Sequence, residues 1–178
     1  HGNQSMNVVI VIADALRRDM LDPERAGGPA MPRLSERFAD WHQFDRCIAS
    51  APWTLPSCTS LMTGRSSDVH QHFAHTHRLT CDLLTERFGT DVVKAAVVNN
   101  SVLAESSGLF EGFDEYTLLR RHDETFDAAH RFLDARQADG KSYFLLLHTN
   151  LAHDYNLHST REHYEWYYPD RDDWFELG

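Results

Sequence analysis

Two side chains in the first third of the chain stand where side chains of their type can do chemistry. Asp14 ends the unbroken apolar run 8–13, and the carboxyl end of such a strand is where open α/β sheets bind ligands. Thr54 stands in the segment 51–57, just before an expected helix start, where free N–H groups favour an alkoxide or a bound anion. A threonine hydroxyl is a poor nucleophile until a metal ion or a base lowers its pKa. A carboxylate and a hydroxyl together therefore indicate metal-assisted ester chemistry.

Both residues also have an ordinary structural interpretation. Asp14 would equally cap a helical segment at 15–20, and Thr54 would equally be a turn or cap residue beside its prolines. His153 and Asp154 follow the last predicted strand and would join the same edge of the sheet, or else be polar loop residues. The residue types alone leave these alternatives open.

The other candidate for a metal site is a group of histidines: His70, His72, His75 and His77. Their spacing matches no standard zinc pattern, and neighbouring histidines in a loop are more often solvated than bound to a metal. Cys58 is interpreted as a small buried residue on a short helix rather than as a redox thiol. The sequence lacks the GxSxG elbow, the phosphate-binding P-loop, GxGxxG and HExxH, so it carries none of these common catalytic signatures.

Length and composition indicate a single soluble domain. The chain has 178 residues, of which 42% are hydrophobic and 25% charged. Its formal net charge of −10 argues against sequence-independent nucleic-acid binding, which needs positive charge to meet the phosphates. No apolar run approaches the roughly 18 residues of a membrane span. The three cysteines are odd in number and widely spaced, which implies neither a disulfide framework nor a zinc site.

The start of the chain bears on its boundaries and location. Residues 1–5 look like the remnant of an affinity tag before a native Met6, which leaves 6–178 as one α/β domain. If Met6 is the true start, the chain has no signal peptide and we expect a cytoplasmic protein.

Apolar runs and helical spacing predict strands that alternate with helices. Strands are expected at 8–13, 44–49, 91–98 and 143–148. Helices are expected at 31–41, at 58–63 with Ser57 as cap, at 79–88 and at 123–138. Because buried strands that alternate with helices form parallel sheets, we predict a mostly parallel sheet with helices on both faces.

Short motifs along the chain follow a known order: NVVIVIADALRRD at 7–19, MPRL at 31–34, APWTLPS at 51–57 with SLMTG at 60–64, AAVVNN at 95–100, GLFEGFDEY at 108–116 and HTNLAHDY at 148–155. In this order they resemble the sulfatase-like branch of the alkaline phosphatase superfamily, of the threonine-nucleophile type, and they cover only its N-terminal portion. The resemblance implies an α/β fold of the alkaline phosphatase and sulfatase kind, acting on a small-molecule phosphate or sulfate ester.

The resemblance also implies roles for individual residues. Asp14 would bind a divalent metal ion (zinc, manganese or calcium), and Thr54 would be both nucleophile and metal ligand. Asn100 and His148 would bind the substrate, and His153 would bind the anion or assist the leaving group. If these roles hold, these side chains cluster at the carboxyl edge of the sheet.

Departures from the sulfatase pattern refine the expected chemistry. Typical sulfatases have a Cys or Ser that becomes formylglycine at the position of Thr54, and an Arg at that of Cys58. They also have a Lys and a His near the strand end that here reads 99–101, and many members carry a second acidic residue where this chain has Ala15. We therefore expect no formylglycine, and a threonine-nucleophile phosphoesterase or phosphotransferase, with sulfate esters the less favoured substrate.

Proteins that the chain resembles are longer and complete their metal site with a C-terminal Asp-His or Asp-Asn pair. No such segment follows residue 155. The pair would then come from a missing C-terminal segment, from a partner or from a second copy in a homo-oligomer. The alternative is a non-catalytic sulfatase-like binding or interaction module with an incomplete metal site, in which the aromatic tail over 164–175 serves as a cover.

Overall fold

The computed structural model describes residues 7–21, 32–44, 46–77 and 79–153. Asp154, the aromatic tail and the tag-like residues 1–5 lie outside these ranges. The described residues form a four-stranded, all-parallel sheet in the order β1-β4-β2-β3. The strands are β1 (Val8–Ala13), β2 (Val92–Val98), β3 (Glu115–Leu118) and β4 (Ser142–Thr149). The predicted α/β class is therefore confirmed.

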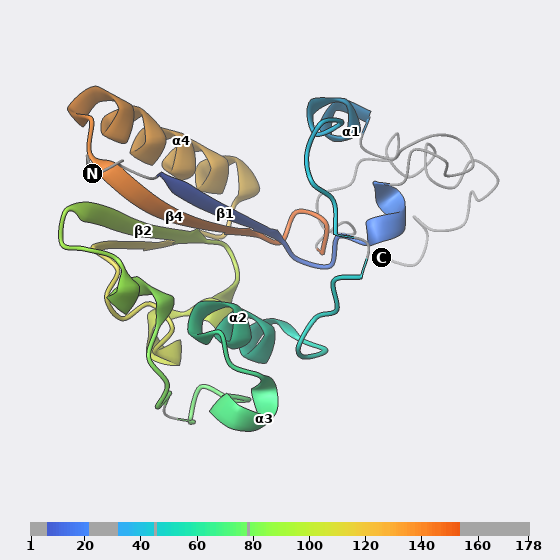
Figure 1. Ribbon diagram of the computed structural model, residues 1–178, viewed down its shortest axis with the longest axis vertical. Coiled ribbons are helices and arrows are strands. Elements are labelled where there is room, and N and C mark those ends of the chain that lie inside the picture. Colours follow the sequence, from blue (N-terminus) through green and yellow to red (C-terminus); the bar gives the residue numbers. More distant parts are fainter. Residues whose placement is uncertain (1–6, 22–31, 45, 78, 154–178) are drawn as a thin grey trace.

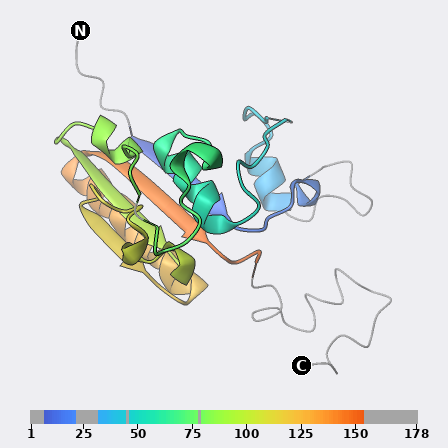
Figure 2. The same ribbon diagram turned by 90° about the horizontal axis from the view of Figure 1, so that it is seen from below.

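Helices cover both faces of the sheet, as predicted. Figure 1 shows α4 (His122–Asp139) on one face, with α2 (Thr54–Thr63) and α3 (Ser67–His70) on the other; Figure 2 shows the same layers from below. The short helix α1 (Pro32–Arg37) lies beyond the carboxyl ends of the strands. Single 3₁₀ turns occur at Arg18–Met20, Leu84–Arg87, Ser101–Leu103 and Glu105–Ser107.

Alternate side chains of the two central strands, β2 and β4, pack into two separate hydrophobic cores, one on each face of the sheet. On the α4 side, Ala95 and Val97 pack with Leu145, Leu147 and the helix residues Ala129 and Phe132. On the α2 side, the core holds Ala96, Val98, Phe144 and Leu146 with Leu55 and Met62. Burial on both faces explains why β2 and β4 are continuous apolar runs. No helix among the described residues is long and apolar enough to cross a membrane.

The register of the sheet brings the strand ends together. Ala13 of β1 pairs with Thr149 of β4, and Val98 of β2 pairs with His148 of β4. The residues that follow these strands therefore meet at one carboxyl edge, which is where parallel sheets place their ligand sites.

β1 is less covered than the two central strands, β2 and β4. Within the described residues β1 pairs with β4 alone. Val9 and Val11 are 45% and 60% exposed, whereas Ile10 and its same-face neighbours pack into the α2-side core. Among the described strands β1 is thus an edge strand, and it exposes Val9 and Val11 on the α4 side of the sheet.

Four sequence predictions were wrong in extent or type. Residues 44 and 46–49 form no strand, and Phe44 and Ile48 are 79% and 89% exposed. The helix predicted at 31–41 is shortened to α1, and the one predicted at 79–88 is only the 3₁₀ turn at Leu84–Arg87. Phe38, Trp41, Phe44 and Ile48 are exposed, so the first two segments lack a facing element against which to pack. The segment 79–88 does pack on the α2-side core, through Leu79, Leu83, Leu84 and Phe88, but only one turn of it is helical.

The fourth prediction concerns where α2 begins. Ser57 does not cap it; the helix begins at Thr54, after Trp53. Pro56 is tolerated because it lies in the first turn, where its missing N–H would have had no intrahelical partner. Gly64 ends the helix as predicted, with a φ of +65° that a residue with a side chain rarely adopts.

Candidate functional site

Asp14 and Thr54 meet at the carboxyl edge of the sheet. Asp14 directly follows β1, and its N–H donates to the Thr149 carbonyl oxygen at 2.9 Å, which continues the pairing with β4. Thr54 is the first residue of α2, and its Oγ1 donates to Asp14 Oδ2 at 2.9 Å. The two residues are 40 positions apart in sequence, so the contact depends on how α2 is set against the end of β1.

The chain leaves β1 through a tight turn that fixes the carboxylate. Ala15, next to Asp14, has a φ of +59°, and the Leu16 N–H bonds to the Ala13 carbonyl at 3.2 Å. A positive φ is uncommon for a residue with a side chain and is found most often where the surrounding structure enforces it. The turn directs Asp14 towards α2.

The N-terminus of α2 is electrostatically suited to negative charge. Trp53 provides no side-chain cap, and the first turn contains no acidic residue. The first backbone N–H groups of a helix have no intrahelical acceptor, and the helix dipole adds partial positive charge there. A phosphoryl or sulfuryl oxygen beside Thr54 would meet these donors.

Asn100 also reaches Asp14. Its Nδ2 donates to Asp14 Oδ2 at 3.3 Å and to Asn150 Oδ1 at 3.2 Å, while its Oδ1 accepts the Val102 N–H at 2.9 Å. Both N–H groups of the carboxamide are therefore engaged within the protein. The predicted contact of Asn100 with substrate would require one of these bonds to open.

His148 lies beneath the carboxylate rather than on the open surface. It is fully buried on β4, with its Nε2 3.6 Å from Asp14 Oδ2. Burial lowers the pKa of His148, and the Asp14 charge opposes that shift in part. Neither ring nitrogen has a hydrogen-bond partner among the described residues, and the predicted contact with a substrate would require this buried ring to become exposed.

His153 stands in the turn after β4, on the open side of this edge. It is exposed, and its N–H bonds to the Asn150 carbonyl at 2.8 Å. A positive charge on His153 would lower the pKa of His148, which places the two rings within electrostatic reach of each other. Its exposed imidazole thus lies at the same edge of the sheet as Asp14.

The oxygen atoms of Asp14 and Thr54 suit a hard divalent cation in kind but not in number. Carboxylate and hydroxyl oxygens are the ligands that such ions prefer. Among the described residues, however, no group of three or more His, Cys, Asp or Glu side chains is arranged to hold a metal ion. Two protein oxygens are fewer than a tight site needs, so the remaining ligands would be water or residues outside the described ranges.

The histidine cluster is structural, and the expectation that its members are solvated was wrong for two of them. His70 and His72 are buried. The His70 ring contacts Ser60 Oγ at 2.9 Å, and the His72 ring contacts Thr59 Oγ1 at 2.8 Å. These contacts fasten α3 and the following loop to α2.

Cys58 is an inert thiol, as its predicted place on a helix implies. It is buried on α2. Burial first, and the Asp14 charge second, raise the pKa of Cys58 to about 12. The thiolate is the reactive form of cysteine, so this side chain is not a nucleophile at neutral pH.

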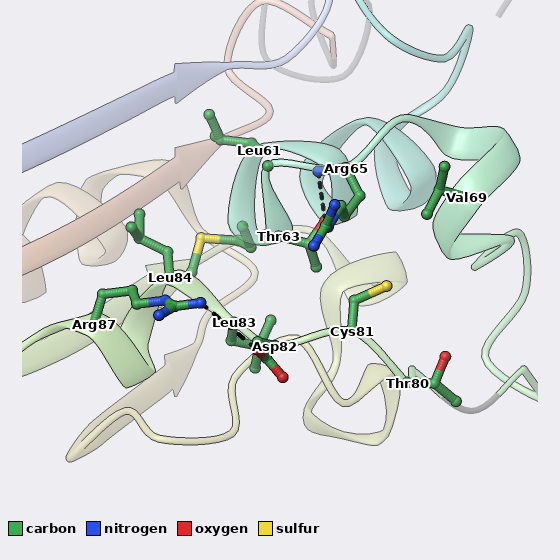
Figure 3. Close-up of a pocket in the computed structure, with 12 residues that line it drawn as sticks. Leu61, Thr63, Arg65, Val69, Thr80, Cys81, Asp82, Leu83, Leu84 and Arg87 are labelled. Atoms are coloured by element: carbon green, nitrogen blue, oxygen red, sulfur yellow. Dashed lines mark hydrogen bonds and ion pairs between the residues drawn. The ribbon is translucent and has the colours of Figure 1, made fainter.

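A cavity of about 420 Å³ lies at the opposite end of α2 (Figure 3). Met62 and Leu83 contribute apolar wall, and Arg65, Arg87 and Cys81 contribute polar atoms. None of its lining residues belongs to the group around Asp14. The cavity is therefore separate from the candidate site.

Comparison with known proteins identifies the fold class. No family model matches the sequence, and no curated protein matches it. The chain has a sulfatase-like α/β fold. It is similar to BT4656, whose structure was solved in complex with its substrate D-glucosamine-2-N,6-O-disulfate. The TM-score is 0.61 at 17% sequence identity, over 80% of this chain and 33% of that one. The chain thus spans about a third of that neighbour's length, and at this identity the likeness shows the fold alone.

Sequence reasoning missed the residues that support the site from behind. Asn99, His122 and Asn150 form buried hydrogen bonds next to Asn100. The only sequence signal was the run of polar residues that ends each buried strand, at 99–101 and 148–150.

Proposed function

We propose that this chain carries part of the active site of a metal-dependent hydrolase or transferase that acts on phosphate or phosphonate esters through Thr54. Sulfate esters are the less favoured substrate. The observation that carries the proposal is the 2.9 Å hydrogen bond between Thr54 Oγ1 and Asp14 Oδ2, at the carboxyl edge of a sulfatase-like sheet. A hydroxyl and a carboxylate at this spacing can share one cation.

Asp14 and Thr54 would hold the metal ion, which could be zinc, manganese or calcium. When bound there, such an ion would stabilise the deprotonated Thr54 hydroxyl near neutral pH. Asn100, which donates to Asp14 Oδ2 at 3.3 Å, would keep the carboxylate oriented. The free N–H groups of the first turn of α2 would bind the non-bridging oxygens of the ester and stabilise their charge.

The proposed reaction has two steps. The Thr54 oxygen, whose proton has passed to water, attacks phosphorus in line; a bond between phosphorus and Oγ1 forms as the ester bond breaks. His153 gives a proton to the departing alkoxide. Water or an acceptor alcohol then attacks the phosphothreonine, releases Oγ1 and transfers the group, and Thr54 recovers a proton.

The choice of phosphorus over sulfur rests on the nucleophile. Thr54 cannot become formylglycine, and Cys58 is buried with its pKa raised to about 12. The neighbour BT4656 has a sulfated sugar as its substrate, so a sulfate ester belongs in every assay beside the phosphate esters.

The test measures turnover of 4-nitrophenyl phosphate, bis(4-nitrophenyl) phosphate, 4-nitrophenyl phenylphosphonate and 4-nitrophenyl sulfate, each with zinc, manganese or calcium. We expect metal-dependent release of nitrophenol from at least one phosphorus ester. Thr54→Ala should lose it, and Thr63→Ala, at the other end of α2, should retain it. Equal rates for the wild type and Thr54→Ala would rule out this mechanism.

A second function is favoured by a different observation. Within the described residues only two oxygens are arranged for a cation, and the edge strand β1 exposes Val9 and Val11 on the α4 side of the sheet. A non-catalytic binding module with this fold would bind metal weakly and associate through that edge. Calorimetric titration with zinc or manganese and the mass in solution separate the two functions. Micromolar metal binding that is lost in Asp14→Ala contradicts the binding module, whereas a stable dimer without metal uptake contradicts the enzyme.

A further inference from the structure

A network of buried hydrogen bonds, most of them between side chains, connects the first residue of α4 to the candidate site. His122 Nδ1 lies 2.7 Å from Asn99 Nδ2, and Asn99 Oδ1 lies 2.6 Å from the Asn150 backbone nitrogen. Asn150 Oδ1 then accepts from Asn100 Nδ2 at 3.2 Å, and Asn100 donates to Asp14. The network joins residues that follow β1, β2 and β4 and a helix on the far face of the sheet.

Backbone N–H groups fix the direction of every bond. Asn99 Oδ1 accepts the Asn150 N–H, so the Nδ2 of Asn99 is its donor and His122 Nδ1 is the acceptor. A neutral His122 then carries its proton on Nε2. Likewise, Asn100 Oδ1 accepts the Val102 N–H, so its Nδ2 must face Asp14 and Asn150. These bonds therefore fix which end of each carboxamide, in Asn99, Asn100 and Asn150, carries the oxygen.

Burying these polar side chains costs desolvation free energy, and their connection to Asp14 gives a reason for that cost. Asn99, Asn100, Asn150 and His122 are all buried. A buried amide is tolerated when it is hydrogen-bonded, but apolar side chains at the ends of these strands would avoid the desolvation cost altogether. The series of bonds ends, through Asn100, at Asp14 Oδ2, which is the same oxygen that accepts the Thr54 hydroxyl.

We propose that Asn99, Asn150 and His122 are positioning residues that hold the Asn100 carboxamide against Asp14 and so keep the carboxylate fixed beside Thr54. The described contacts of the Asp14 side chain all use Oδ2. The network therefore occupies one oxygen and keeps the other available to a cation. The catalytic consequence rests on the proposed function, whereas the positioning itself does not.

The experiment compares Asn150→Ala and His122→Phe with a matched control, Thr125→Val. Thr125 is buried on the same helix, one turn from His122, and within the described part of the chain its hydroxyl donates to the Arg121 carbonyl oxygen. Nuclear magnetic resonance of the full chain follows the Asn100 side-chain amide, the Thr54 methyl group and the Asp14 carboxyl carbon. Initial rates on the best 4-nitrophenyl ester follow catalysis.

We expect both network variants to shift the Asn100 amide and the Thr54 methyl signals, although His122 touches neither residue in the described contacts. Turnover should fall about tenfold through kcat, with KM changed less than twofold, as for residues that orient metal ligands. Thr125→Val should leave the signals and kcat unchanged. Long-range proton–nitrogen spectra should show the proton of His122 on Nε2.

Two outcomes would overturn the proposal. Unchanged Asn100 and Thr54 signals in Asn150→Ala would show that the network does not position the site, whether or not the chain is active. Shifted signals with an unchanged kcat in an active protein would show that the positioning has no catalytic role. A wild type that turns over no ester contradicts the proposed function, while the signals still decide the positioning.

Discussion

Thr54 and Ser60 lie on the same helix, each in contact with a titratable partner from elsewhere in the chain, and we expect only the first pair to do chemistry. Thr54 and Asp14 meet at the first turn of α2, and Ser60 and His70 meet near its end. By residue type, the serine and histidine look more like a nucleophile and its base. The hydrogen bonds around each pair reverse that judgement.

The partner of Ser60 cannot accept its proton. The His72 N–H donates to His70 Nδ1 at 3.0 Å, so a neutral His70 carries its proton on Nε2 and donates it to Ser60 Oγ. Thr54, in contrast, donates to a carboxylate that accepts. The neighbours of the partner, rather than the partner's type, decide whether a hydroxyl can be activated.

The largest expected effect is the loss of turnover in Thr54→Ala. Removal of a nucleophile lowers kcat by a factor on the order of 10³ or more, whereas Ser60→Ala should change it less than threefold because Ser60 only accepts a structural bond. Initial rates on the ester that gives the highest wild-type rate measure both. A large loss in Ser60→Ala with an active Thr54→Ala would move the site to the other pair.

Metal affinity gives the second contrast between the pairs. Asp14→Asn keeps the acceptor oxygen for Thr54 but removes the charge, so we expect divalent cations to bind at least about 100-fold more weakly. His70→Gln should leave the affinity within a factor of two. Calorimetric titration with manganese measures the affinity of both variants for the ion. The reverse order of effects would place the metal at the histidine cluster.

The sequence predicted β2 and β4 because a parallel strand that is buried on both faces leaves an apolar run. β1 was predicted from the same kind of run, although its Val9 and Val11 are exposed. α4 was predicted from its helical spacing and from Gly140, which ends it in a left-handed conformation. β3 was missed because it is a short edge strand of four residues with exposed ends. A false strand was predicted at 44–49 because local preference says nothing about whether a partner strand is present.

The site divides in the same way. Asp14 was predicted from its place at a strand end, because the carboxyl edge of a parallel sheet follows from topology. The contact with Thr54 relied on motif order, since nothing local predicts how α2 meets β1. The network of Asn99, His122 and Asn150 was beyond prediction, because its bonds join residues 23, 50 and 51 positions apart. Those distances close only once the strand register is known.

Acid should loosen the structural histidine pairs. Burial is the main cause that lowers the pKa of both His70 and His72, and the Asp68 charge opposes it at His70. The unfolded chain therefore binds protons more readily, so stability is full above the unfolded pKa of about 6.5 and falls as the pH drops below it. Urea unfolding between pH 7.5 and 5 should show this decline.

The variant His72→Gln tests the source of that decline. It should cost about 1–3 kcal/mol at pH 7.5, because it disturbs a buried hydrogen bond to Thr59, and it should reduce the slope with pH. Part of the slope remains, since burial also lowers the pKa of His148. His130→Gln, at an exposed site on α4, is the control and should leave the slope unchanged. An unaltered slope in His72→Gln would assign the acid sensitivity to other groups.

The smallest effect is expected at Cys58, which lies on α2 between the two pairs. A thiol whose pKa is raised to about 12 by burial and by Asp14 stays protonated at neutral pH. Iodoacetamide at pH 8 should therefore modify the exposed Cys47 and spare Cys58 in the folded chain.

Cys58→Ser should keep most of the activity and lose about 1–2 kcal/mol of stability, because it buries a more polar group of similar size. Mass spectrometry of the labelled and unlabelled protein reads both the site of alkylation and any processing. A mass loss at Cys58 that matches conversion to formylglycine would move the nucleophile from Thr54 to a modified cysteine one turn further along the helix.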